Sequence, residues 1–153
     1  MMQKIPRAFV GWNILVVDDE RDSLEVATRL LKFAGATVTP VNNGYDALQH
    51  IKQDKSTFRF ILTDLSMPEM DGWELLYQLK QDLPLLDIPI IALTAHAMAG
   101  DRERGMAAGF HNYITKPLDP NKFIHQLVNL LVDIPELASS LNVDTSKSQG
   151  VSQ

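Results

Sequence analysis

The sequence predicts an α/β fold, a doubly wound (βα)5 sandwich built on a parallel sheet. Short runs rich in Val and Ile recur five times along the chain, and each is followed by a longer segment of helical period. These runs hold few polar residues, which is typical of strands buried on both faces. Such alternation favours a parallel sheet with helices on both sides. The chain has 153 residues and is 45% hydrophobic, enough for one such domain.

The first third of the chain contains two strand-and-helix units. Residues 14–17 (ILVV) form an uninterrupted apolar run and predict the first strand. Residues 21–34 carry apolar side chains spaced by 3, 4 and 3 positions, which predicts a helix, and Gly35 stands where a helix stop is expected. Residues 37–41 then predict a short second strand, and residues 45–53 predict a second helix.

The middle of the chain repeats the pattern. Residues 59–62 (RFIL) predict the third strand, and residues 72–80 predict the third helix. Residues 88–93 predict the fourth strand, which contains Pro89 close to its beginning, where proline is tolerated.

Two further units complete the predicted set. Residues 98–108 predict a weakly patterned fourth helix that ends at Gly109. Residues 111–115 predict the fifth strand, and residues 121–132 predict a last helix with four apolar side chains on one face.

Right-handed crossovers leave few ways to connect five parallel strands, and the flavodoxin-like order 2-1-3-4-5 is a common one. We expect this order in a domain that spans residues 13–132. Residues 1–12 are then an N-terminal extension. Residues 133–153 contain five serines and no aromatic residue, which predicts a flexible C-terminal tail.

Composition excludes several classes of function. Nineteen acidic and fourteen basic residues give a net charge of −5, whereas direct binding to DNA usually requires a basic surface. The chain has no cysteine, which excludes disulfides, thiolate zinc sites and a cysteine nucleophile. No apolar run is long enough to span a bilayer, and the apolar stretch at residues 8–17 has no cleavage site of a secretory signal after it. We therefore expect a cytoplasmic protein without membrane insertion.

Polar residues stand at the ends of four predicted strands. Asp18 and Asp19 follow the first strand, and Asp64 follows the third. Thr94 follows the fourth strand and Lys116 the fifth. In open α/β sheets, ligands bind beyond the carboxyl ends of the strands, where the strand order reverses. Since strands one and three flank that point, the three carboxylates are expected to converge.

Converging carboxylates imply a cation. Two like charges about 4 Å apart repel by roughly 4 kcal/mol at an effective dielectric constant of about 20, and a cation among them would offset this cost. Oxygen ligands with open positions suit Mg²⁺, which commonly binds one or two carboxylates, water and a phosphate. Lys116 adds an ammonium and Thr94 a hydroxyl. A metal, these donors and a carboxylate nucleophile, Asp64, indicate phosphoryl transfer.

At these residues the sequence resembles the receiver domain of two-component response regulators. Residues 18–20 (DDE) match the acidic pair of that family, and residues 64–72 (DLSMPEMDG) match its phosphoacceptor loop. Residues 94–95 (TA) match the switch hydroxyl, and residues 113–117 (YITKP) match the switch aromatic residue and the lysine. The resemblance covers residues 13–132.

The resemblance implies a set of metal ligands around the phosphoacceptor. Asp19 and Asp64 would bind Mg²⁺ directly, and Asp18 would act partly through water. The backbone carbonyl of Ser66 would be a further protein ligand. Ser66 and His96 would flank the approach of the water that hydrolyses the phosphoaspartate, so both are expected to tune its lifetime.

The resemblance also implies a switch. Lys116 would bind one phosphoryl oxygen, and Thr94 would move to bond another. Tyr113 would turn inward behind Thr94 and reshape the face made by helix four, strand five and helix five. The peptide bond between Lys116 and Pro117 is expected to be cis.

The predicted function follows from these roles. The protein would accept a phosphoryl group from a sensor histidine kinase or a histidine phosphotransfer protein and then bind a downstream protein target. It would be a signalling protein that catalyses only its own phosphorylation and autodephosphorylation. We expect a stand-alone regulator; a receiver excised from a hybrid kinase is the alternative organisation. The alternative function is a receiver-like interaction module that works without phosphorylation.

Other nucleotide-related classes lack their motifs. Gly100 and Gly105 have P-loop spacing, but Met106 replaces the required lysine, and no G-x-G-x-x-G occurs. An aspartyl-phosphate phosphatase would need a second acid where Ser66 stands. The four histidines are scattered and form no metal-binding spacing.

Overall fold

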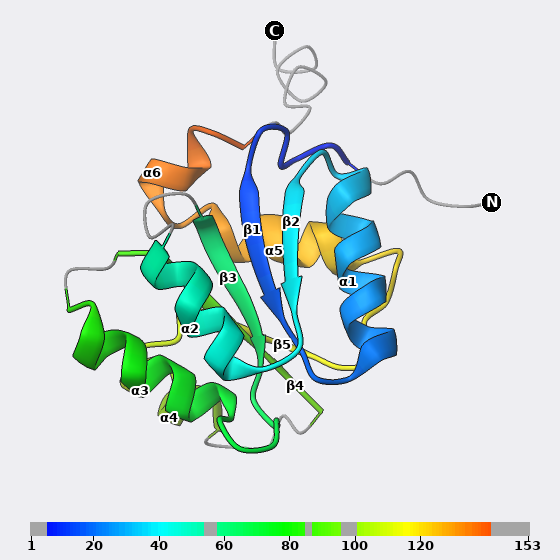
Figure 1. Cartoon of the computed structure of the whole chain (residues 1–153). Coiled ribbons are helices and arrows are strands. Elements are labelled where there is room, and N and C mark those ends of the chain that lie inside the picture. The colour runs from blue at the N-terminus through cyan, green and yellow to red at the C-terminus, as the bar shows by residue number, and fades with distance from the viewer. Residues whose placement is uncertain (1–5, 54–57, 85–86, 96–100, 142–153) are drawn as a thin grey trace, which may run out of the picture.

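The structure, a computed structural model, describes residues 6–53, 58–84, 87–95 and 101–141. Five parallel strands form one sheet in the order β2-β1-β3-β4-β5, which confirms the predicted fold class and topology (Figure 1). The strands are β1 (Asn13–Val17), β2 (Thr37–Val41), β3 (Phe58–Asp64), β4 (Ile90–Thr94) and β5 (Asn112–Thr115).

Helices connect the strands and cover both faces of the sheet. Side chains of α1 and α5 pack into one hydrophobic cluster, and side chains of α2 and α3 pack into the cluster on the other face. The helices are α1 (Arg21–Phe33), α2 (Gly44–Gln53), α3 (Gly72–Asp82), α4 (Asp101–Ala108), α5 (Phe123–Leu131) and α6 (Pro135–Ala138). Among the described residues, none of these helices is long and apolar enough to cross a membrane.

The central strand β1 shows why its sequence is continuously apolar. Ile14 and Val16 belong to the cluster shared with α1 and α5, whereas Leu15 and Val17 belong to the cluster shared with α2 and α3. Successive side chains of a strand point to opposite faces, so both faces need apolar residues here. Burial of each such side chain contributes about 1.5–3 kcal/mol.

Two strands are longer than their apolar runs at the carboxyl end. β3 continues through Asp64, which is paired with Leu93, and β4 continues through Thr94, which is paired with Thr115. Both functional candidates therefore lie within the sheet rather than after it, and the backbone pairing holds their positions. The predicted start of the fourth helix, at residue 98, lies outside the described residues; α4 is described from Asp101.

Residues on both sides of the predicted domain, 13–132, pack against it. Phe9 and Trp12 are buried, and their rings contact each other and Phe60. Leu137 of α6 is buried in the same cluster, and the Trp12 indole N–H donates to the Ser140 carbonyl at 3.3 Å. The segment before β1 and the segment after α5 thus belong to the folded core. Residues 142–153 of the expected tail lie outside the described residues.

Candidate functional site

Parallel pairing brings the acidic residues together. Val17 of β1 is paired with Thr63 of β3, so the next residues, Asp18 and Asp64, lie at the same level of the sheet. One carboxylate oxygen from each of Asp18, Asp19 and Asp64 lies within 4.8 Å of the other two. Asp18 and Asp64 are buried, whereas Asp19 is exposed. The predicted convergence of the three carboxylates is present at the carboxyl edge of the sheet.

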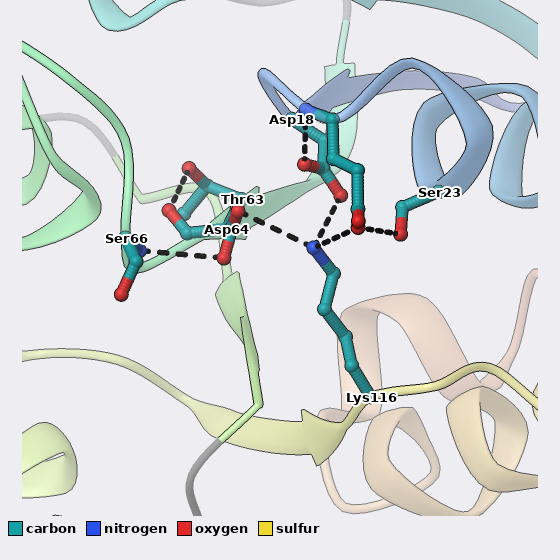
Figure 2. Close-up of polar contacts among 7 residues, drawn as sticks. Asp18, Ser23, Thr63, Asp64, Ser66 and Lys116 are labelled. Atoms are coloured by element: carbon teal, nitrogen blue, oxygen red, sulfur yellow. Dashed lines mark hydrogen bonds and ion pairs between the residues drawn. The ribbon is translucent and has the colours of Figure 1, made fainter.

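Lys116 places its ammonium among the carboxylates. Its Nζ lies 2.9 Å from Asp18 Oδ2 and 3.3 Å from Asp64 Oδ2, and Figure 2 shows the side chain reaching across from the end of β5. A third contact, to Glu20 Oε1, measures 3.4 Å. The ammonium thus compensates part of the repulsion that the acidic residues exert on one another.

Opposing influences set the pKa of Asp64. Burial and the charge of Asp18 raise it to about 6, although Lys116 and the backbone N–H of Ser66, which donates to Asp64 Oδ1 at 3.3 Å, both lower it. Burial lowers the pKa of Lys116, but its contacts with Asp18 and Asp64 outweigh this effect and raise it. The site therefore pairs a carboxyl group that ionises less readily than usual with an ammonium that holds its proton more tightly than usual.

The loop after β3 closes tightly under Asp64. The Gly72 N–H donates to the Leu65 carbonyl at 3.0 Å, and a Cβ at position 72 would lie only 2.5 Å from the backbone oxygen of Asp64. Asp71 then caps α3 by accepting the Glu74 N–H at 2.8 Å. Glycine and the cap together fold residues 64–72 back against the acidic residues.

The switch candidates occupy neighbouring strands. Thr94 is buried at the end of β4, and half-buried Tyr113 on β5 is paired with Ala92 and packs against the cluster of α2 and α3. The bond between Lys116 and Pro117 is cis, as the resemblance implied. His96 lies outside the described residues.

Sequence reasoning assigned no role to two residues at this site. Glu20 contacts Lys116, and the Ser23 hydroxyl donates to the same Glu20 oxygen at 2.5 Å. The two residues stand at the N-cap and third positions of α1, the spacing of a capping box with its residue types exchanged. This exchanged capping box could have predicted the contact between Glu20 and Ser23. It does not predict the contact with Lys116, which lies 96 residues away in the sequence.

Comparison with known proteins agrees with this fold. Residues 14–128 match the response regulator receiver domain, and the chain belongs to this family. It is 33% identical over 121 residues to the polar-differentiation response regulator DivK of Brucella anthropi, covering 79% of this chain and 97% of DivK. It is 34% identical over 141 residues to the probable transcriptional regulator ycf29 of Pyropia yezoensis, covering 92% of this chain but 63% of that protein.

Further similarity extends to a kinase and to solved receivers. The chain is 38% identical over 109 residues to the sensor histidine kinase GacS of Pseudomonas protegens, covering 69% of this chain and 12% of the kinase. Chemotaxis protein CheY4 of Vibrio cholerae superposes with a TM-score of 0.70 at 27% identity, covering 78% of this chain and 98% of CheY4. The Arabidopsis thaliana CKI1 receiver domain, complexed with Mg²⁺ and BeF₃⁻, superposes at 0.65 with 30% identity, covering 86% and 92%.

Proposed function

We propose that this protein is a phosphorelay receiver whose phosphoacceptor is Asp64. The proposal rests on the convergence of Asp18, Asp19 and Asp64 at the switch point of the sheet, where the ammonium of Lys116 contacts Asp18 and Asp64. Like charges that are brought together where they are partly buried repel one another. Such an arrangement is typical of a functional site rather than of the hydrophobic core.

The donor set fits a hard divalent cation. Three carboxylate oxygens within 4.8 Å of one another match the preference of Mg²⁺ for oxygen ligands, and the exposed Asp19 leaves a side open to solvent. Asp19 and Asp64 would bind the ion directly, Asp18 partly through water, and Ser66 through its backbone carbonyl. When bound, Mg²⁺ supplies charge neutralisation for the transferred phosphoryl group.

The chain's own groups perform the rest of the transfer. An Asp64 carboxylate oxygen attacks phosphorus of a phosphohistidine, the P–O bond forms, and the P–N bond breaks. The electron pair of that bond stays on the imidazole nitrogen of the donor protein. Lys116, already 3.3 Å from Asp64 Oδ2, donates to a phosphoryl oxygen, and Thr94 donates to another. The donor is a sensor histidine kinase or a histidine phosphotransfer protein, a proposal supported by the similarity to receivers within kinases.

Signal output would use the face of α4, β5 and α5. Thr94 moves toward the phosphoryl group, and Tyr113 turns inward behind it, which changes the surface that a downstream protein target contacts. Ser66, exposed on the loop after β3, and His96 flank the water approach and tune the lifetime of the phosphoaspartate. Such a protein works in the cytoplasm, where its kinase presents the phosphohistidine.

Labelling with acetyl phosphate in the presence of Mg²⁺ tests the assignment. We expect one phosphoryl group per chain in the parent protein and none in Asp64→Asn, because the amide keeps the shape but is a poor nucleophile. Thr94→Ala serves as the matched control and should still be labelled. A parent that takes no label would instead favour a receiver-like interaction module that works without phosphorylation.

A further inference from the structure

We propose that Glu20 is a positioning residue that holds the ammonium of Lys116 on the α1 side of the site and so lowers the affinity for a phosphoryl group. The inference rests on the proposed function and deepens it. Glu20 is not one of the residues proposed above to bind Mg²⁺ or the phosphoryl group, but it would set how tightly the site binds that group.

Three contacts fix Glu20 in place. Its backbone N–H donates to Asp18 Oδ1 at 2.9 Å, its Oε1 accepts the Ser23 hydroxyl at 2.5 Å, and the same Oε1 lies 3.4 Å from Lys116 Nζ. Figure 2 shows Ser23 on the same side of the Lys116 ammonium as Asp18. An otherwise exposed side chain is therefore held in one orientation.

The orientation of Glu20 is not explained by helix capping. Glu20 is the N-cap residue of α1, with φ −86° and ψ 114°, yet its side chain accepts no hydrogen bond from a backbone N–H of the first turn. A carboxylate at this position ordinarily bonds to free backbone N–H groups. Here it turns toward Ser23 and Lys116 instead, so that its carboxylate faces the ammonium of Lys116.

Counting donors shows what this contact does to the site. A lysine ammonium has three N–H donors, and three carboxylates surround this one, those of Asp18, Glu20 and Asp64. A phosphoryl group on Asp64 needs one of these donors for its own oxygens. The Glu20 side chain is 63% exposed, against 0% for Asp18 and 8% for Asp64, so water screens its attraction most. Of the three contacts, the one with Glu20 is therefore the one that phosphoryl binding releases at the lowest cost.

Beryllofluoride, which mimics a phosphoryl group without forming a lasting covalent product, provides the test. Its affinity is measured by calorimetry at saturating Mg²⁺ for the parent and for Glu20→Gln. We expect the substitution to tighten binding about two- to fivefold, the range that corresponds to an exposed ion pair. Ser23→Ala, which changes no charge, should tighten binding in the same direction by less, because Glu20 is then free to rotate away.

Asp22→Asn is the matched control. Asp22 is an exposed acidic residue in the first turn of α1 and is not among the three carboxylates that contact Lys116. Equal tightening in Asp22→Asn and Glu20→Gln would show a general charge effect and overturn the inference, as would an unchanged Ser23→Ala. A parent that binds no beryllofluoride would instead overturn the proposed function, and this inference with it. Melting temperatures verify that each variant is folded.

Discussion

At the scale of single residues, Asp64 combines two demands that conflict. It is buried beside Asp18, which opposes its ionisation, but a nucleophile must be ionised. Lys116 at 3.3 Å lowers the cost without removing it, since the pKa of Asp64 remains raised to about 6. Near neutral pH the acceptor is therefore an anion, and its ionisation lowers the free energy of unfolding. Functional sites commonly reduce stability in this way.

The stability of the protein should record this cost. Because the folded pKa of Asp64, about 6, lies above its ordinary value of 3.8, the native state binds more protons between these values, and stability falls as pH rises from about 4 to 6. Asp64→Asn removes the titration and should be more stable than the parent at pH 7.5, on the order of 2 kcal/mol. Urea unfolding at pH 7.5 and at pH 4 measures this, and the advantage should shrink at pH 4. A variant less stable than the parent at pH 7.5 would contradict the sign.

At the scale of elements, the loop from β3 to α3 depends on one glycine. A Cβ at Gly72 would meet the Asp64 backbone oxygen at 2.5 Å and Leu65 Cα at 2.9 Å, and backbone atoms cannot move aside cheaply. We expect Gly72→Ala to destabilise the fold by roughly 1–3 kcal/mol and to slow labelling of Asp64 by acetyl phosphate. Gly105→Ala is the control, because its nearest neighbour is a Phe110 ring atom at 3.6 Å. Equal stability of the two variants would show that the loop can open.

The elements also show which features were accessible from the sequence. Strand ends were predictable because an apolar run followed by Asp18 or Asp64 marks both a strand and its carboxyl edge. The exact ends of β3 and β4 were not, since backbone pairing carries both strands past their apolar residues. The Glu20–Lys116 contact was not predictable either. It joins side chains 96 residues apart in the sequence and depends on their conformations, which hydrophobic periodicity does not indicate.

At the scale of the whole molecule, the site and α6 lie at opposite edges of the sheet. Figure 1 shows α6 at the edge away from the tips of the strand arrows, where the acidic residues lie. The packing of Trp12 and Leu137 against the core could not be predicted from the sequence, because a single turn of helix and two aromatic residues in a loop produce no repeating pattern. Both segments complete the core cluster between α1 and α5.

This separation predicts a substitution that affects stability alone. Leu137→Ala removes a buried side chain and should cost about 2–5 kcal/mol of unfolding free energy. Val132→Ala, at a side chain that is largely exposed, should change stability by less than about 0.5 kcal/mol. Chemical denaturation measures both. Labelling of Asp64 under native conditions should equal that of the parent in each variant, and a loss in Leu137→Ala below its melting temperature would reveal coupling between the two edges.

Binding of Mg²⁺ should stabilise the whole domain, because an ion that binds only the folded state shifts unfolding by mass action. At an ion concentration ten times its dissociation constant, the gain is about 1.4 kcal/mol, which raises the melting temperature by several degrees. Asp19 is exposed and is not among the residues that contact Lys116, so Asp19→Asn should relieve repulsion and leave the apo protein at least as stable while weakening the response to Mg²⁺. Thermal unfolding with and without the ion, at constant ionic strength, separates binding from screening. An undiminished Mg²⁺ response in Asp19→Asn would exclude this carboxylate as a ligand.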